Sequence, residues 1–173
     1  MVLFILEKNI DSDYFIKMCL KQYLNMANNL NLDVDLELLN DKNLVEKIHI
    51  NRDKKPYFTV DNKPINIYFN LSHTKGAMVL LMDTNEVGVD IEKIKDRDYK
   101  AIAKRENFEV SSLVDFYKMW TKCEAFVKYY GDSFANIKNN KDFDLSTVKT
   151  IDVLDGYVIS IKPYDNLLIS ILT

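Results

Sequence analysis

The chain has 173 residues, of which 47% are hydrophobic and 12% aromatic, enough for the core of one domain or of two small fused halves. Its 23 Lys and Arg residues against 26 Asp and Glu give a net charge of −3, which argues against binding to nucleic acid or to a membrane surface. Cys19 and Cys123 lie far apart without metal-type spacing, which favours a reducing compartment. With no long apolar run and no typical signal peptide, we expect a cytoplasmic protein.

The first half of the chain is predicted to form a strand, a helix and several short strands. Residues 2–6 are an uninterrupted apolar run, typical of a buried strand. Residues 11–30 carry apolar residues at helical spacing, and Asp11 or Ser12 is the expected N-cap. Turn-forming residues separate four further predicted strands, at residues 47–50, 57–60, 67–73 and 77–83.

The second half repeats this order of elements without repeating the sequence. A strand at residues 87–92 precedes a helical segment at 99–108 and a long amphipathic helix at 111–131. Three more strands are predicted at residues 148–154, 156–163 and 167–173. We therefore expect an α+β fold with two similar α/β halves, residues 1–85 and 86–173. Only four Gly and three Pro are present, so the halves should form one compact unit.

Two acidic residues interrupt the apolar strand at residues 87–92. Asp90 and Glu92 are two positions apart, so they project from the same face of the strand and repel each other. One interpretation is a half-buried strand whose polar side faces water. The other is a hard-cation site, since paired carboxylate oxygens suit Mg²⁺.

The long helix at residues 111–131 offers a third carboxylate. Glu124 falls within the apolar stripe, between Leu113 and Tyr117, and is expected to point inward. Lys128 lies at the edge of that stripe, whereas Lys122 projects from the opposite face. The pair Glu124 and Lys128 could be a helix-surface ion pair. Alternatively, Glu124 joins the strand acids at a metal, which would relieve the cost of an unpaired inward carboxylate.

These residues carry a resemblance to a known family. "GVDIE" and "WTKCEAFVK" resemble the motifs G-x-D-x-E and W-x-x-K-E-x-x-x-K of the pseudo-dimeric, Sfp-type 4′-phosphopantetheinyl transferases. "KKPYF" and "FNLSHT" resemble two upstream segments of the same family, so the similarity is best over residues 47–131. The resemblance implies two halves related by a pseudo-two-fold axis. It also implies Mg²⁺-dependent transfer of phosphopantetheine from coenzyme A to a serine of an apo-acyl or apo-peptidyl carrier protein, with release of 3′,5′-ADP.

The resemblance also implies roles for individual residues. Three carboxylates would hold Mg²⁺ with the pyrophosphate of coenzyme A, namely Asp90, Glu92 and Glu124. Glu124, or a metal-held water beside it, is the candidate base for the serine proton. Lys128 would lie near the pyrophosphate. The expected contacts to the 3′-phosphate are Lys55, Ser72 and His73.

The sequence departs from the family pattern in three places. One is length, because the gap between "GVDIE" and "WTKCEAFVK" and the N-terminal portion look shorter than in larger family members, which affects the expected surface for the carrier protein. Cys123 stands where the family has a lysine, and the first long helix lacks an expected arginine. Further phosphate contacts could come from Arg52, Lys54 or Lys75, each of which could equally be a solvated surface charge. Two hypotheses follow, an active transferase or a non-catalytic member that binds coenzyme A or a carrier protein. Since one chain contains both walls of the expected cleft, we expect a monomer.

Overall fold

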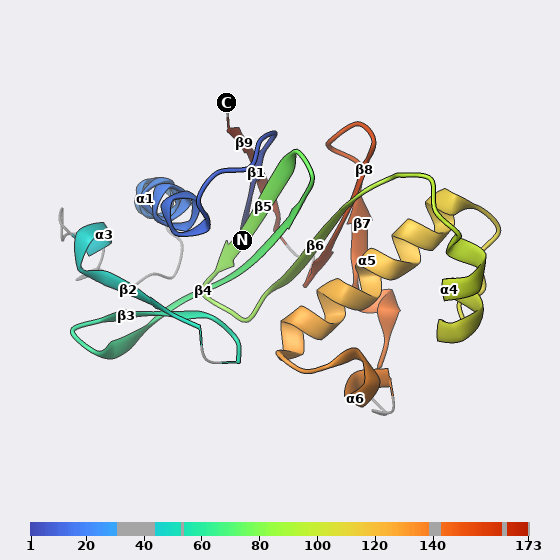
Figure 1. Cartoon of the computed structure of the whole chain (residues 1–173). Helices are drawn as coiled ribbons and strands as arrows, with labels where there is room; N and C mark the ends of the chain where they lie inside the picture. The colour runs from blue at the N-terminus through green and yellow to red at the C-terminus, as the bar shows by residue number, and fades with distance from the viewer. Residues whose placement is uncertain (31–43, 53, 139–142, 164–165, 173) are drawn as a thin grey trace.

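The computed structural model describes residues 1–30, 44–52, 54–138, 143–163 and 166–172 (Figure 1). The first half forms β1 (Val2–Leu6), α1 (Ser12–Leu30), α3 (Leu44–Lys47), β2 (Ile48–Asn51), β3 (Tyr57–Val60), β4 (Lys63–Thr74) and β5 (Ala77–Asp83). The second half forms β6 (Gly88–Lys93), α4 (Tyr99–Glu106), α5 (Leu113–Tyr130), α6 (Phe134–Lys138), a short 3-10 helix (Leu145–Thr147), β7 (Lys149–Ile151), β8 (Tyr157–Lys162) and β9 (Leu168–Leu172).

The start of α1 is fixed by one of the two predicted caps. Helix α1 begins at Ser12, and Asp11 Oδ1 accepts a hydrogen bond from the backbone N–H of Tyr14 at 2.9 Å. Such a bond satisfies a backbone donor that the first helical turn leaves unpaired. Asp11 is therefore the N-cap residue.

The described strands form two sheets. The larger has the order β2-β3-β4-β5-β1-β9 and the smaller the order β6-β8-β7. Strand β9 pairs in parallel with β1, from Val2 opposite Leu168 to Leu6 opposite Leu172. The larger sheet thus contains strands from both predicted halves, because the last described strand returns to lie beside the first. The expected mixture of helices and sheets is confirmed.

The two sheets and the two long helices form successive layers (Figure 1). Helix α1 packs on one face of the larger sheet, in a core that includes Phe4 and Phe69. The other face of that sheet contributes Leu3 to a second core, shared with Val89 and Ile161 of the smaller sheet. Helix α5 covers the remaining face of the smaller sheet, against β6 and β8. The acidic strand β6 therefore lies in the interior, between the larger sheet and α5.

Helix α5 lies very close to β6 because β6 begins with a glycine. A Cβ atom at Gly88 would lie 2.2 Å from the carbonyl oxygen of Ala125 and 2.6 Å from the backbone nitrogen of Tyr129. Real Cβ atoms do not approach backbone this closely, so any other residue would displace the helix. The glycine of "GVDIE" thus sets the spacing at which α5 faces Asp90 and Glu92.

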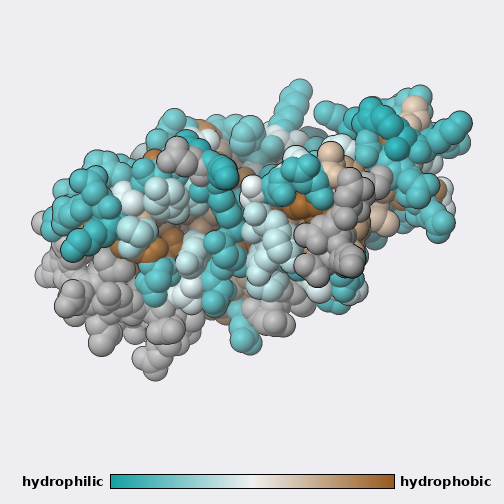
Figure 2. All heavy atoms as spheres, turned by 90° about the horizontal axis from the view of Figure 1, so that it is seen from below, coloured by the Kyte–Doolittle hydropathy of each residue, from teal (hydrophilic) through white to brown (hydrophobic). Residues whose placement is uncertain are grey.

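The surface is mainly hydrophilic on the face shown in Figure 2, where hydrophobic residues appear in separate small areas among polar ones. Among the described residues, no helix is both long enough and apolar enough to cross a membrane.

Candidate functional site

Asp90 is the centre of a buried polar network. Its side chain is 7% exposed, and its Oδ1 accepts hydrogen bonds from Ser72 Oγ at 2.8 Å and from Lys128 Nζ at 2.7 Å. Lys128 Nζ also donates to Ser72 Oγ at 2.9 Å. Asp90 Oδ2 is buried and has no hydrogen-bond partner among the described residues. One oxygen of the carboxylate is therefore tied to Ser72 and Lys128, while the other is unsatisfied.

Two further carboxylates lie beside Asp90. Glu92 of β6 and Glu124 of α5 are half-buried. Burial is the main cause that raises the pKa of Glu124, and the charge of Asp90 raises it further, while Lys128 opposes the shift. Burial also raises the pKa of Glu92, again with a contribution from Asp90. Desolvation and repulsion between neighbouring charges thus raise the pKa of both Glu92 and Glu124, which the sequence motifs had indicated as site residues.

The chemistry of this group suits a hard divalent cation. An unsatisfied buried carboxylate oxygen and two repelling carboxylates would all gain from a cation that carries two charges. Within the described part of the chain, however, no three His, Cys, Asp or Glu side chains are arranged so that they could hold a metal ion as they stand. Lys128 is the cation that now contacts Asp90. The donor set fits Mg²⁺, and its side chains would have to draw together to bind it.

Lys55 is anchored at the start of β3 by contacts with the second half of the chain. Its Nζ donates to Glu86 and, at 2.7 Å, to the carbonyl oxygen of Tyr129. Its stem lies against Gly131, where a Cβ atom would meet Lys55 Cβ at 3.2 Å. Gly131 has φ +66° and caps α5, which is a conformation that favours glycine. Burial lowers the pKa of Lys55, and Glu86 opposes the shift.

A cleft of about 430 Å³ separates the Lys55 segment from β4 and the end of α5. We call it the cationic cleft because five of its lining residues are basic or can become so: Arg52, Lys54, Lys55, His73 and Lys128. Its remaining lining residues include Asn70, Gly131 and Asp132. Several cationic groups around one opening favour an anionic ligand such as a phosphate. Lys128 both lines this cleft and contacts Asp90, so the cleft and the carboxylates share one residue.

Two of the predicted phosphate contacts, Ser72 and Lys75, do not line the cationic cleft. Ser72 is 5% exposed and contacts Asp90 instead of lining the cleft. Lys75 lies in the turn between β4 and β5, where its carbonyl oxygen accepts from Tyr157 at 3.2 Å. Lys122 faces a different cavity, on the other flank of α5. Cys123 is 2% exposed and packs in the interior, as expected for a structural cysteine.

The sequence interpretation missed residues that support the site. Asn70 Oδ1 accepts a hydrogen bond from the backbone N–H of Val89 at 3.0 Å, and Glu86 pairs with Lys55. Asn70 could have been found, because it lies two residues before Ser72 in a strand and so shares its face. Glu86 carried no comparable signal, since its partner lies 31 positions earlier in the chain.

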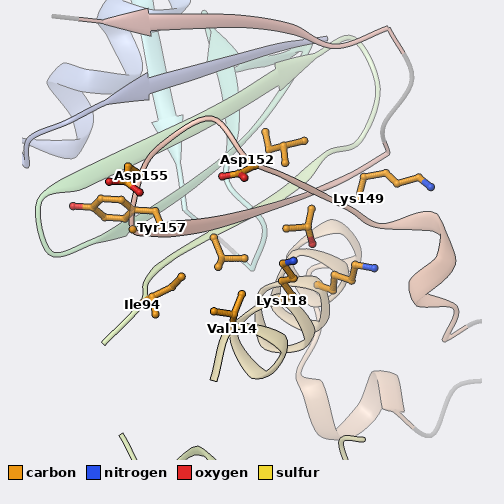
Figure 3. A pocket seen from close by; sticks show the side chains of 12 residues that line it. Ile94, Val114, Lys118, Lys149, Asp152, Asp155 and Tyr157 are labelled. Atoms are coloured by element: carbon orange, nitrogen blue, oxygen red, sulfur yellow. The ribbon is translucent and has the colours of Figure 1, made fainter. Parts of the chain in front are cut away.

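A second cavity lies outside this site (Figure 3). It measures about 530 Å³ and lies between α5 and the edge of the smaller sheet. Val114 and Lys118 of α5 face it from one side, and Asp152, Asp155 and Tyr157 from the other. Neither Lys128 nor any of the carboxylates Asp90, Glu92 and Glu124 lines it, whereas Lys128 connects the cationic cleft to Asp90, so the size of this second cavity does not make it the candidate site.

Comparison with known proteins identifies relatives of one kind. The 4′-phosphopantetheinyl transferase gsp of Aneurinibacillus migulanus is 28% identical over 137 residues, covering 66% of this chain and 54% of that protein. The 4′-phosphopantetheinyl transferase AcpT of Salmonella typhi is 36% identical over 92 residues, covering 46% of each chain. A putative 4′-phosphopantetheinyl transferase of Haemophilus influenzae is 32% identical over 114 residues, covering 58% of this chain and 47% of that protein.

The similarity confirms the resemblance that the motifs indicated: the chain is a relative of the 4′-phosphopantetheinyl transferases. It spans about half the length of the curated relatives that it matches. No protein-family model matches the chain.

Proposed function

We propose that the protein transfers the 4′-phosphopantetheine group from coenzyme A to a serine of an apo-acyl or apo-peptidyl carrier protein, in a Mg²⁺-dependent reaction. The observation that carries this proposal is the position of Lys128. Lys128 lines the cationic cleft, and its ammonium group lies 2.7 Å from the buried Asp90 carboxylate. Lys128 would therefore contact both the bound phosphate groups and a residue that binds the metal ion. The relatives of the chain carry the name of this transferase, which supports the same conclusion.

In this proposal the cationic cleft binds the phosphates of coenzyme A. Lys55 is held at its wall by Glu86 and Tyr129, so little side-chain freedom would be lost on binding. His73 and Lys54 are exposed in the same cleft and add donors for an anionic group. We assign the 3′-phosphate to Lys55 and His73, and the pyrophosphate to the end of the cleft at Lys128.

The carboxylates would bind the cation, and one of them would take part in accepting the proton of the serine. Asp90, Glu92 and Glu124 are the proposed ligands, and a bound Mg²⁺ would offset negative charge on the phosphates. Lys128 would neutralise further charge as the serine oxygen attacks the β-phosphorus and the bond to 3′,5′-ADP breaks. In the metal-free protein burial raises the pKa of Glu124, so its carboxylate accepts a proton more readily than an exposed one, and we assign the serine proton to Glu124 or to a metal-held water beside it.

The alternative is a relative that binds coenzyme A or a carrier protein without turnover. Cys123, buried where the family has a lysine, removes one cation from this part of α5. The chain also spans only about half of its relatives. We favour the transferase because a simple binding role would not require three neighbouring carboxylates, one of which has a buried, unsatisfied oxygen.

The deciding experiment is a transfer assay with mass detection. Purified protein is incubated with Mg²⁺, coenzyme A and a panel of apo-carrier proteins, and each carrier is weighed by mass spectrometry. The transferase proposal expects the mass gain of phosphopantetheine on at least one carrier, and loss of that gain in the Asp90→Ala variant. Binding of coenzyme A without any mass gain across the panel would support the alternative. Sedimentation of the protein during turnover tests the expectation that its active form is a monomer.

Two broader proposals accompany this function. The halves before and after residue 86 would be related by the pseudo-two-fold axis that the family resemblance implies, with the cationic cleft between them. The reaction would take place in the cytoplasm, where coenzyme A and apo-carrier proteins are expected to meet. Localisation of a tagged protein in cells, followed by fractionation, would check the second proposal.

A further inference from the structure

Strands β4 and β6 lie side by side but belong to different sheets. Side chains of β4 accept hydrogen bonds from the backbone of β6: Val89 N–H donates to Asn70 Oδ1 at 3.0 Å, and Ile91 N–H donates to Ser72 Oγ at 3.3 Å. Asn70 and Ser72 are 6% and 5% exposed, so these bonds are made away from solvent. The seam between the sheets is therefore closed by two side chains of the "FNLSHT" segment.

The hydroxyl group of Ser72 is fully used within this seam. It has one donor and two acceptor positions. Its partners fix their use without ambiguity, because the Asp90 carboxylate can only accept and both Lys128 Nζ and Ile91 N–H can only donate. Ser72 therefore donates to Asp90 and accepts from the other two. Neither a donor nor an acceptor is left for a ligand phosphate.

This arrangement fixes the orientation of the Asp90 carboxylate. Oδ1 is held by Ser72 and Lys128, and Oδ2 is turned to a buried position without a partner among the described residues. A carboxylate free to rotate could exchange the two oxygens. With Ser72 bonded to Oδ1, and Ser72 itself held by the backbone of β6, such an exchange would break buried hydrogen bonds.

We propose that Ser72 is a positioning residue for Asp90 and not a contact to the 3′-phosphate of coenzyme A. It holds Oδ1 so that Oδ2 is the oxygen available to a divalent cation. This inference rests on the proposed metal-dependent function, and it reassigns a residue that motif similarity placed with Lys55 and His73. Residues that orient a metal ligand in this way commonly change metal affinity by 10-fold to 100-fold when they are replaced.

The test compares Ser72→Ala with Asn70→Ala in protein without coenzyme A. Both variants lose one buried hydrogen bond to the backbone of β6, but only Ser72→Ala also removes a hydrogen bond to Asp90 Oδ1, so Asn70→Ala is a matched control. Mn²⁺ serves as the probe, and free Mn²⁺ is measured by its electron paramagnetic resonance signal. We expect Ser72→Ala to weaken Mn²⁺ binding about tenfold or more, Asn70→Ala to change it less than about twofold, and Ser72→Thr, which keeps the hydroxyl, to restore most of the affinity.

Affinities for coenzyme A and 3′-dephospho-coenzyme A give the second readout. Ser72→Ala should leave their ratio unchanged, because Ser72 does not contact the 3′-phosphate. A Ser72→Ala variant with normal Mn²⁺ binding and a reduced preference for the 3′-phosphate would overturn the inference. If Ser72→Ala fails to fold, Ser72→Cys keeps the side-chain size with a weak donor, and the same two outcomes decide.

The inference and the proposed function can fail separately. Wild-type protein that binds Mn²⁺ and shows the Ser72 effect, yet transfers nothing to any carrier, would refute the transferase and leave the positioning role intact. Wild-type protein that binds no Mn²⁺ but performs transfer would overturn the positioning role and the metal site while leaving the transferase in place.

Discussion

Removal of the Lys128 ammonium group tests whether the buried network is held together by charge. The Lys128→Met variant keeps the length of the side chain and deletes its hydrogen bonds to Asp90 and Ser72, at 2.7 and 2.9 Å. Breaking a buried ion pair by removing one partner costs about 3–5 kcal/mol. Asp90 retains the Ser72 donor, and the Lys128 side chain is 28% exposed, so water can replace part of the interaction. We therefore expect the lower end, about 3 kcal/mol, in the free energy of unfolding.

The assay is urea denaturation in EDTA, which keeps divalent cations out of the comparison. A double-mutant cycle with Asp90→Asn isolates the charge term. In the Asp90→Asn background, Lys128→Met should cost only about 1 kcal/mol, the value of an ordinary hydrogen bond. The coupling energy should thus be about 2 kcal/mol. Lys118→Met is the matched control, because Lys118 lies exposed on α5 and forms no ion pair among the described residues, so its effect should stay within about 0.5 kcal/mol.

The reasoning would be refuted by equal costs in the two backgrounds. Lys128→Met would then act through lost packing, and the pair with Asp90 would contribute no stability. A cost below about 0.5 kcal/mol in the wild-type background, no larger than that of Lys118→Met, would contradict the burial argument itself.

Three further predictions address packing, acidity and phosphate binding. Gly88→Ala should lower the free energy of unfolding by about 3 kcal/mol, measured in urea, because α5 must move away from β6; unchanged stability would contradict the close approach. Glu124→Gln should stabilise the metal-free protein at pH 7, since burial raises the pKa of Glu124 above the ordinary value of 4.5 and ionisation in the folded protein therefore costs stability. The gain should shrink as the pH falls from the raised pKa towards 4.5 and be absent below 4.5, where the side chain is protonated in both the folded and the unfolded protein; a pH-independent gain would argue against this cause. Lys55→Met should lower the affinity for coenzyme A about tenfold in calorimetry, with little effect on the affinity for 3′-dephospho-coenzyme A. Lys75→Met, outside the cleft, should change neither affinity. Equal losses of affinity for both ligands would refute the assignment of Lys55.

Local sequence patterns predicted most of the helices and strands and identified the acidic strand. The apolar runs at β1 and β5 were predicted with the bounds that the structure has, because a buried strand needs an unbroken apolar segment between turn residues. Asp90 and Glu92 could be placed on one face from their spacing alone. The family resemblance also followed from sequence, since it depends on short motifs in a fixed order.

Local sequence patterns did not predict two short helices or the full length of one strand. The short helices α3 and α6 were not predicted, because four or five residues give too little periodicity to detect. Strand β4 begins at Lys63, four residues before the predicted start, since its first residues pair with β3 and are mostly exposed. Pairing with a neighbouring strand extended it where hydrophobicity gave no signal.

The assembly of the site depends on contacts between residues that lie far apart in the chain. Ser72 has the same place in its motif whether it faces a phosphate or a carboxylate, and the contact with Asp90 depends on the seam between two sheets. The return of β9 to β1 and the anchoring of Lys55 by Glu86 and Tyr129 likewise join residues far apart in the chain. Such contacts arise from packing of whole elements, and no local spacing encodes them. For the same reason, the burial that raises the pKa of Glu124 depends on the packing of α5 against β6, which its local sequence does not encode.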